Sequence, residues 1–276
     1  VPSQVRIKSY INMYGTGQSD YNIMDRFRVE DYRPQAIARM VDRYRDNILG
    51  LKIRMSEGVA ENMEALDATI ALAGELGVGV CVHVSKPLVP LNEIADRLRP
   101  GDIFCHVYQN VGIDNIFEAD TGKVKQSIWK ARERGVILDA ANGKMNFNIT
   151  CCKEAVAQGL WPDVVASDWL SDKYNYSPYT KNLMFILTKY LELGMPLQQA
   201  LATVTATPAR LMGMEGRIGT LAAGAYADVA IFKRVEKTVR HLDFDGTPFE
   251  THQLFIPQMV LSDGEFAFCQ ADFALV

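Results

Sequence analysis

The sequence predicts an α/β fold, a TIM (β/α)₈ barrel that carries a smaller β-rich portion toward its C-terminal end. Short apolar segments alternate with amphipathic ones along most of the 276 residues, which is typical of parallel strand–helix units. The strand candidates recur at roughly 30-residue spacing, as the eight units of a barrel require. The rival doubly wound sheet favours a glycine-rich phosphate loop after an early strand, and none follows one here.

Six segments have the length and apolar, β-branched composition of buried strands. They are residues 5–13, 49–55, 78–84, 102–108, 135–141 and 163–169. In the second of them, Leu51-Lys52-Ile53-Arg54-Met55, apolar and basic residues alternate. Lys52 and Arg54 should therefore share one side of a strand, with the apolar side chains on the other.

The segments between these strands have the apolar periodicity of helices. They are residues 34–47, 60–77, 91–98, 123–135 and 150–159. Glycine or proline stands at most of the joints, as at Gly77, Pro100-Gly101 and Gly135, and both residue types end regular elements.

The last third of the chain changes in character. A tyrosine-rich loop at 172–179 and two further helical segments follow the sixth strand candidate. From Gly216 the pattern changes to turns and short strands. The predicted domains are therefore a barrel over residues 1–213 and a β-sandwich portion over 214–276.

Composition excludes several classes of protein. With 48% hydrophobic and 22% charged residues the chain is an ordinary globular one, and a formal net charge of −4 provides no basic surface for nucleic acid. No apolar run reaches the roughly 18 residues of a membrane span, and the first residues lack the apolar block of a signal peptide. Five cysteines are few and odd in number, so we expect reduced thiols and a cytoplasmic location.

Four side chains with metal-binding or acid–base chemistry stand at the carboxyl ends of strand candidates: Lys52, His83, His106 and Asp168. In a barrel these ends meet on one rim, where functional residues gather. Imidazole and carboxylate are ligands that Zn²⁺ takes. A single strand-end histidine is more often a structural hydrogen-bonder, but matching positions on consecutive strands favour a shared site.

Motifs around these residues give the chain a family resemblance. KIR on one strand, CVHVS on the next, GDIFCHVYQN on the one after and ASDW further on resemble the amidohydrolase superfamily. The stretch TVTATPARLMGMEGRIGTLAAGAYADVAIF is similar to that superfamily's closing pattern, a T-x-x-P-A helix followed by G-x-I-x-x-G-x-x-A-D. The branch it resembles most is the dihydroorotase-like deacetylases, which hydrolyse N-acetyl amino acids and related esters.

The resemblance implies a metal-dependent hydrolase of amide or ester bonds, either an N-acyl amino acid deacetylase or a cyclic amide hydrolase. Lys52 resembles the lysine that CO₂ carbamylates, whose new carboxylate bridges two divalent ions, expected to be zinc. His83 and His106 would bind one ion and Asp168 the other. A metal-bound hydroxide would attack the carbonyl, and Asp168 would take its proton and pass it to the leaving amine. Carbamylation needs a neutral amine, so we expect burial and nearby cations to lower the pKa of Lys52.

A small-molecule substrate is expected at the same rim. The predicted contacts are Arg54, Tyr108, Asn110 and Asn142, with Asp139 and the 172–179 loop as further candidates. Arg54 can clamp a substrate carboxylate through its forked guanidinium, and a salt bridge to an acid inside the barrel is the equally weighted alternative. The family usually has a glycine-histidine-glycine-like stretch where this chain has Ala141-Asn142-Gly143, so the substrate's identity is not implied.

The family also needs an H-x-H pair on its first barrel strand, and no two of the four histidines here are two residues apart. The separation of Lys52 and Asp168 along the chain matches four strand steps of the family, so residues 5–13 resemble the third strand. The barrel strands present are then the third to the eighth. We therefore expect an N-terminal segment or a companion chain that carries the H-x-H pair, and a homo-oligomer.

Three alternatives stay open. A non-catalytic amidohydrolase-like scaffold or partner chain would have an incomplete metal site, but it has no use for Lys52, His83, His106 and Asp168 together. A one-metal deaminase of the same superfamily does not need a bridging lysine. A Schiff-base lysine in an aldolase-type barrel leaves the histidines and the aspartate without a joint purpose.

Overall fold

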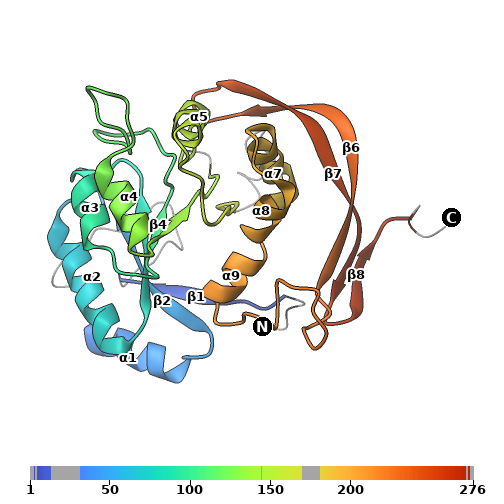
Figure 1. The fold of residues 1–276 in the computed structure, drawn as a ribbon. Coiled ribbons are helices and arrows are strands. Elements are labelled where there is room, and N and C mark those ends of the chain that lie inside the picture. The colour runs from blue at the N-terminus through green and yellow to red at the C-terminus, as the bar shows by residue number, and fades with distance from the viewer. Residues whose placement is uncertain are drawn as a thin grey trace. The chain divides into compact units, whose positions relative to one another are not determined.

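The structure, a computed structural model, describes residues 3, 5–13, 32–143, 145–169, 181–271 and 273. The chain forms two compact units (Figure 1). The strand–helix unit comprises residues 8–141 and 145–163, and the C-terminal unit comprises residues 1–7, 142–144 and 164–276. This division differs from the boundary near residue 214, which stays a prediction about domains.

Five parallel strands form the core of the strand–helix unit. They are β1 (Ser9–Asn12), β2 (Ile48–Met55), β3 (Gly79–Val84), β4 (Ile103–Cys105) and β5 (Ile137–Asp139). Their order in the sheet is the order of the sequence. A doubly wound sheet would reverse its strand order at a switch point, so the sequential order is that of a barrel, in agreement with the prediction.

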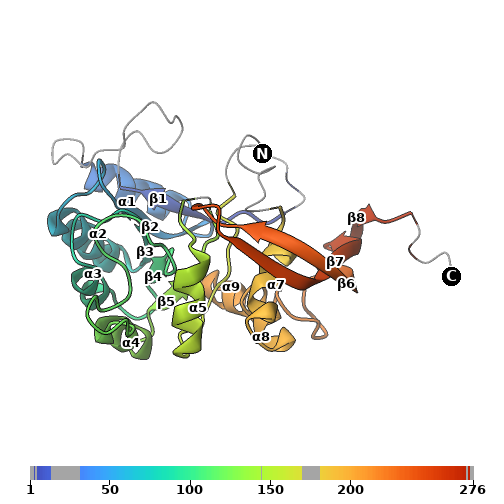
Figure 2. The ribbon, with the colours of Figure 1, turned by 90° about the horizontal axis from the view of Figure 1, so that it is seen from above.

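The helices of this unit follow the predicted segments to within a few residues; the first four connect the five strands and the fifth follows the last strand. They are α1 (Pro34–Arg43), α2 (Met63–Leu76), α3 (Leu91–Arg97), α4 (Gln126–Glu133) and α5 (Ile149–Ala157). Proline at the first turn begins α1, and Gly77 ends α2 in the left-handed conformation at φ 65°. Figure 2 shows α1 to α4 along one side of the five strands.

Strand β2 separates its two faces as its alternation predicts. Leu51, Ile53 and Met55 are fully buried, and α2 packs against β2 and β3. Lys52 and Arg54 point to the opposite face and are half-buried. The helices thus cover the apolar face, and the two cations lie on the inner face of the sheet.

Residues 163–169 do not form the regular strand that the sequence predicts. The carboxylate of Asp163 accepts a hydrogen bond from the Leu138 amide at 2.9 Å, and the Asp163 amide donates to the Leu138 carbonyl at 2.9 Å. A side chain therefore takes the place of a backbone acceptor in the ladder. The backbone of Asp168 is left-handed, with φ 50°, which ends any extended stretch.

In its described residues the C-terminal unit combines helices with an antiparallel sheet. The helices are α7 (Leu183–Glu192), α8 (Leu197–Ala202) and α9 (Ala206–Leu211), and the strands are β6 (Val229–Leu242), β7 (Pro248–Ser262) and β8 (Glu265–Cys269). Asn182 caps α7 by accepting from the Phe185 amide at 2.8 Å. The sheet has the order β6-β7-β8, and α7 packs on β7. The predicted change from helices to strands is thus observed after α9.

Two further findings bear on the expected class of protein. In the part of the chain that the structure describes, no helix is long and apolar enough to cross a membrane. All five cysteines are free thiols. Cys151 and Cys152 are buried in α5.

Candidate metal centre and its rim

Three of the four predicted metal-site residues lie together at the carboxyl ends of adjacent strands. Lys52 is on β2 and His83 on β3, while His106 follows the last residue of β4. The rings of His83 and His106 meet edge to face, with their centroids 4.4 Å apart. In the register of β2 and β3, Arg54 pairs with His83, and Lys52, two residues earlier on β2, pairs with Cys81. The inner face of the sheet therefore brings a lysine and two imidazoles to one end.

His106 is fixed by its backbone and by its ring. Its φ is 69°, a left-handed conformation that costs a non-glycine residue about 1 kcal/mol or more and that is found most often at functional sites. Its amide donates to the Asp139 carbonyl at 2.9 Å, and Nδ1 lies 3.2 Å from the Ala141 carbonyl oxygen. A carbonyl only accepts, so Nδ1 carries the proton and the lone pair is on Nε2. This is the tautomer that a metal-binding histidine uses.

Burial and charge keep His83 neutral. Its burial, followed by His106, Lys52 and Arg54, lowers the pKa of His83 well below its ordinary value. A neutral imidazole is the form that binds metal ions.

Opposing effects act on the pKa of Lys52 in the protein itself. Burial does lower the pKa of the ammonium, but Cys81, Cys105 and Asp139 raise it, and the net direction is upward. The ammonium donates to Cys81 Sγ at 3.4 Å. Burial thus acts on Lys52 in the direction that the sequence predicts, and the lowering of its pKa by nearby metal cations stays a prediction.

Sulfur and carboxylate groups line the inner face beside these residues. Cys105 Sγ donates to Asp139 Oδ2 at 3.3 Å, and both residues are buried. Hydrogen bonding to Cys81, burial and the neighbouring Asp139 raise the pKa of the Cys105 thiol well above its usual value. The raised pKa favours the protonated thiol of Cys105, and both Cys81 and Cys105 are buried in the barrel wall.

Two polar groups on the inner face have no protein partner among the described residues. Arg54 Nε is buried without a hydrogen-bond acceptor, and Asn12 Oδ1 on β1 is buried without a donor. Within that same part of the chain Arg54 forms no ion pair, so the alternative of a salt bridge to a barrel acid is not found there. A buried donor without an acceptor is costly. Asn12 was not among the sequence candidates.

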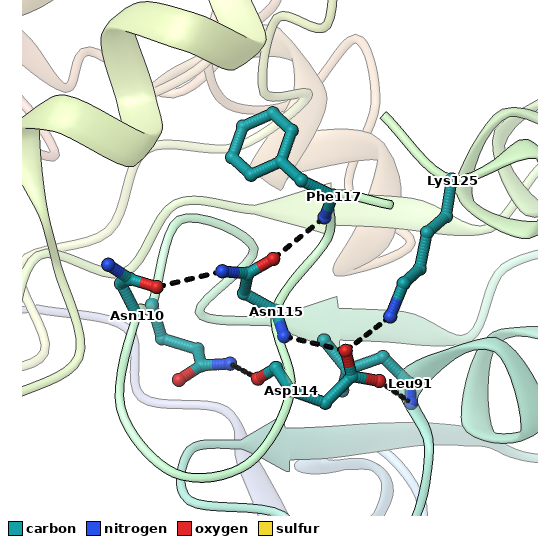
Figure 3. Close-up of polar contacts among 7 residues, drawn as sticks. Leu91, Asn110, Asp114, Asn115, Phe117 and Lys125 are labelled. Carbon is teal, nitrogen blue, oxygen red and sulfur yellow. Dashed lines mark hydrogen bonds and ion pairs between the residues drawn. The ribbon is translucent and has the colours of Figure 1, made fainter. Parts of the chain in front are cut away.

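The loop that follows His106 is held by a polar network centred on Asp114 (Figure 3). Its carboxylate accepts from the Leu91 amide at the start of α3 at 2.8 Å and forms an ion pair with Lys125. Asn115, next in the chain, donates through its side chain to Asn110 Oδ1 at 2.8 Å. Because Asp114 caps α3, the loop that carries Asn110 is tied to a helix of the scaffold.

The predicted substrate contacts are found in different surroundings. Asn110 is exposed. Tyr108 is fully buried, and its hydroxyl donates to the Leu160 carbonyl at 2.7 Å. Asn142 is buried in the C-terminal unit. Substrate contact stays a prediction for all three, and the 172–179 loop lies outside the described residues.

Asp168 belongs to the C-terminal unit, where its carboxylate rests on Gly143. A Cβ atom at position 143 would lie 1.7 Å from Asp168 Oδ2 and 2.6 Å from its Cγ. Only a glycine leaves room for the carboxylate in this position. The Asn142 amide, one residue before, donates to the Ala166 carbonyl at 2.9 Å, so the two short segments are held side by side.

The metal-binding side chains of the strand–helix unit do not form a complete metal site by themselves. Among the residues that the structure describes, no group of three or more histidine, cysteine, aspartate or glutamate side chains has an arrangement that can hold a metal ion. Part of such a centre is present in the imidazoles of His83 and His106, with the Nε2 lone pair of His106, and in Lys52 beside them. Any further ligands come from outside this cluster.

Comparison with known proteins relates this arrangement to a family. The amidohydrolase family model matches residues 29–266. A deacetylase of Agrobacterium fabrum is 26% identical over 275 residues, which cover 96% of this chain and 64% of that protein. The chain thus spans less than two thirds of that relative.

Two solved structures share the fold. The crystal structure of an adenine deaminase matches with a TM-score of 0.87 at 20% identity, over 95% of this chain and 71% of that one. That of a dihydroorotase matches with a TM-score of 0.84 at 24% identity, over 98% and 70% of the two chains. The resemblance of the motifs and the barrel prediction are confirmed: the chain belongs to the amidohydrolase family.

Proposed function

We propose that this chain provides the catalytic core of a metal-dependent hydrolase of amide or ester bonds, of the N-acyl amino acid deacetylase or cyclic amide hydrolase type. The observation that carries the proposal is the edge-to-face pair of His83 and His106 beside Lys52 at the strand ends of an amidohydrolase-family chain. The similarity to a deacetylase supports the acyl-transfer chemistry.

His83 and His106 would hold one divalent ion, expected to be zinc, and Lys52 would bridge to a second as its carbamate. The buried imidazoles and the tautomer of His106 fit this role. The H-x-H pair that the family uses is absent from the sequence, so it would come from an N-terminal segment or a companion chain. A homo-oligomer and a cytoplasmic location stay predictions.

When bound, the metal would supply a Lewis acid that polarises the carbonyl and makes water a stronger nucleophile. The chain's own groups would do the rest. Asp168 would accept the proton of the attacking water and return it to the leaving amine. The left-handed backbone at His106 and Asp168, with φ 69° and 50°, is the kind of strain that is kept where a side chain must be aimed.

Arg54 would bind a carboxylate of the substrate. Its buried Nε without a partner in the described part of the chain would be satisfied by an anion, and a carboxylate fits the guanidinium fork. We expect Arg54→Met to raise KM for an N-acetyl amino acid by about 10- to 100-fold, because a charged hydrogen bond of about 1.5–3 kcal/mol is lost, with kcat unchanged.

The measurement compares an N-acetyl amino acid with the same compound as its carboxamide. Arg54→Met should affect the acid and spare the carboxamide, and Arg54→Lys should lie between the wild type and Arg54→Met because lysine keeps the charge and loses the fork. Equal KM values for the acid in the wild type and Arg54→Met would show that Arg54 does not bind the carboxylate.

Lys52 gives the test of the metal centre. We expect Lys52→Ala to lose most of its bound zinc and its activity, and an added short carboxylate such as propionate to restore part of both, because it replaces the carbamate oxygens. Metal content is measured on the purified variants by elemental analysis. Lys86→Ala, which removes an exposed lysine paired with Glu57 at 3.9 Å, is the control. Full zinc occupancy in Lys52→Ala without carboxylate would exclude the carbamate bridge.

A deaminase is the second candidate, because an adenine deaminase is among the similar structures. A one-metal deaminase has no need of Lys52, whereas the proposed hydrolase does. Release of ammonia from adenine by Lys52→Ala at the wild-type rate would favour the deaminase. A protein that binds zinc and turns over neither class of substrate would favour the scaffold.

A further inference from the structure

Helix α7 contains a lysine in a place where lysines are rarely found. Lys189 is only 3% exposed and lies among Met184, Phe185, Ile186, Leu187 and Tyr190, which are all buried as well. A buried ammonium is costly unless hydrogen bonds or opposite charge compensate it. The proposed mechanism does not use this group, so the presence of a buried charge at this position needs a separate explanation.

The Lys189 ammonium donates to the side chain of Asn142. Its Nζ lies 3.0 Å from Asn142 Oδ1. The Asn142 amide nitrogen Nδ2 in turn donates to the Ala166 carbonyl at 3.4 Å and to the Tyr190 hydroxyl at 3.1 Å. Since Nζ can only donate, it also fixes which end of the Asn142 amide faces Ala166. All four residues lie in the C-terminal unit.

Asn142 connects this ammonium to the carboxylate of Asp168. Its backbone amide donates to the Ala166 carbonyl at 2.9 Å, which holds the segment two residues before Asp168. The residue after it, Gly143, is the surface on which the Asp168 carboxylate rests, since a Cβ there would lie 1.7 Å from Oδ2. A shift of Asn142 would therefore move both the support of Asp168 and the backbone leading to it.

We propose that Lys189 is a positioning residue for Asp168, acting through Asn142. The ammonium holds the Asn142 amide against the Ala166 carbonyl, and this contact aligns the Ala166–Asp168 segment with Gly143. The inference rests on the proposed function in one respect, that Asp168 transfers the proton. It assigns Asn142 to the support of Asp168 and not to the substrate.

The test measures kcat and KM of the zinc-loaded protein for an N-acetyl amino acid, together with thermal melting, in three variants. Lys189→Met keeps the size of the side chain and removes the donor. It should lower kcat about 10- to 100-fold, the effect of displacing a catalytic group by about 1 Å, with KM within twofold. Asn142→Ala should likewise lower kcat and leave KM within twofold of the wild type. In the double variant the second change should add little, because both act along one path.

Thr188→Val is the matched control. Thr188 is the neighbouring buried residue on α7, and its hydroxyl donates to the Phe185 carbonyl at 2.7 Å, away from Asn142. This variant should melt at a lower temperature with kcat unchanged, which separates loss of stability from loss of alignment. If Asn142→Ala does not fold, because it leaves the buried Lys189 ammonium without its acceptor, Lys189→Met decides the question, since it removes the donor and the buried charge together.

Wild-type kcat in folded Lys189→Met or Asn142→Ala overturns the positioning role. A raised KM with normal kcat in Asn142→Ala also overturns it and makes Asn142 a substrate contact. Asp168→Asn is measured in parallel. If the wild type is active and Asp168→Asn is not, a normal Lys189→Met refutes the positioning role alone, whereas an inactive wild type refutes the proposed function and the positioning role together.

Discussion

Replacing Asp168 by asparagine is expected to lower kcat by about 10³-fold or more while most of the zinc stays bound. General acid–base catalysis by one side chain contributes about 10²- to 10⁴-fold, and Asp168 would serve in both steps, as base and then as acid. Asparagine keeps the shape and one oxygen, so it can still act as a weak ligand, but it cannot accept a proton.

Turnover and zinc content are measured on the same preparation of Asp168→Asn. Asp120→Asn, a change of the same kind at an exposed turn of the strand–helix unit, is the control and should match the wild type in both. A rate for Asp168→Asn within threefold of the wild type would remove Asp168 from the mechanism. Loss of all the zinc from Asp168→Asn would show that Asp168 acts mainly as a zinc ligand.

Gly143→Ala is the second change for which we expect a large effect, with activity lowered at least 10²-fold and stability nearly unchanged. The new methyl group would stand where the Asp168 carboxylate now lies, 1.7 Å from Oδ2. The three nearest atoms are Oδ2, Cγ and, at 3.0 Å, Cβ of Asp168. Rotation of the side chain moves the first two away, and a backbone shift of a few tenths of an ångström relieves the contact with Cβ. The carboxylate would then leave the position from which it transfers a proton.

Two comparisons make this result specific. Gly219→Ala forces a Cβ to within 2.6 Å of the Thr205 carbonyl in a left-handed backbone at φ 69°, so it should lower the melting temperature and leave kcat unchanged. In the Asp168→Asn background, Gly143→Ala should cost little more activity, because the group it displaces no longer acts. A Gly143→Ala variant with full activity would show that the observed carboxylate position is not the catalytic one.

Local patterns in the sequence were sufficient to predict five of the six barrel strand candidates and the inner-face cluster. Alternation in Leu51-Lys52-Ile53-Arg54-Met55 placed the two cations opposite the helices, and the structure has them there. His83 and His106 stand at the ends of neighbouring strands, which predicts that their rings lie close together, and the structure has them in contact. Both inferences rely on the period of two in a strand and on the common polarity of parallel strands, which depend only on local sequence.

The remaining features depend on contacts between distant residues. Lys189 lies in a segment with ordinary helical periodicity, where a lysine would be expected on a solvated face, and only the packing of α7 buries it. The rise in the pKa of Lys52 comes from Cys81 and Asp139 on other strands. Asp163 replaces a backbone acceptor by its own carboxylate, so the apolar run after it does not become a strand.

The most direct test of the central claim is hydrolysis of N-acetyl amino acids by the purified, zinc-loaded protein together with the segment or companion chain that carries the H-x-H pair. The appearance of free amine is followed before and after a chelator. The account predicts turnover that the chelator abolishes and that added zinc restores, with no turnover in Lys52→Ala. Turnover that is indifferent to the chelator, or none in zinc-loaded protein with any acyl substrate offered, would contradict a metal-dependent amidohydrolase.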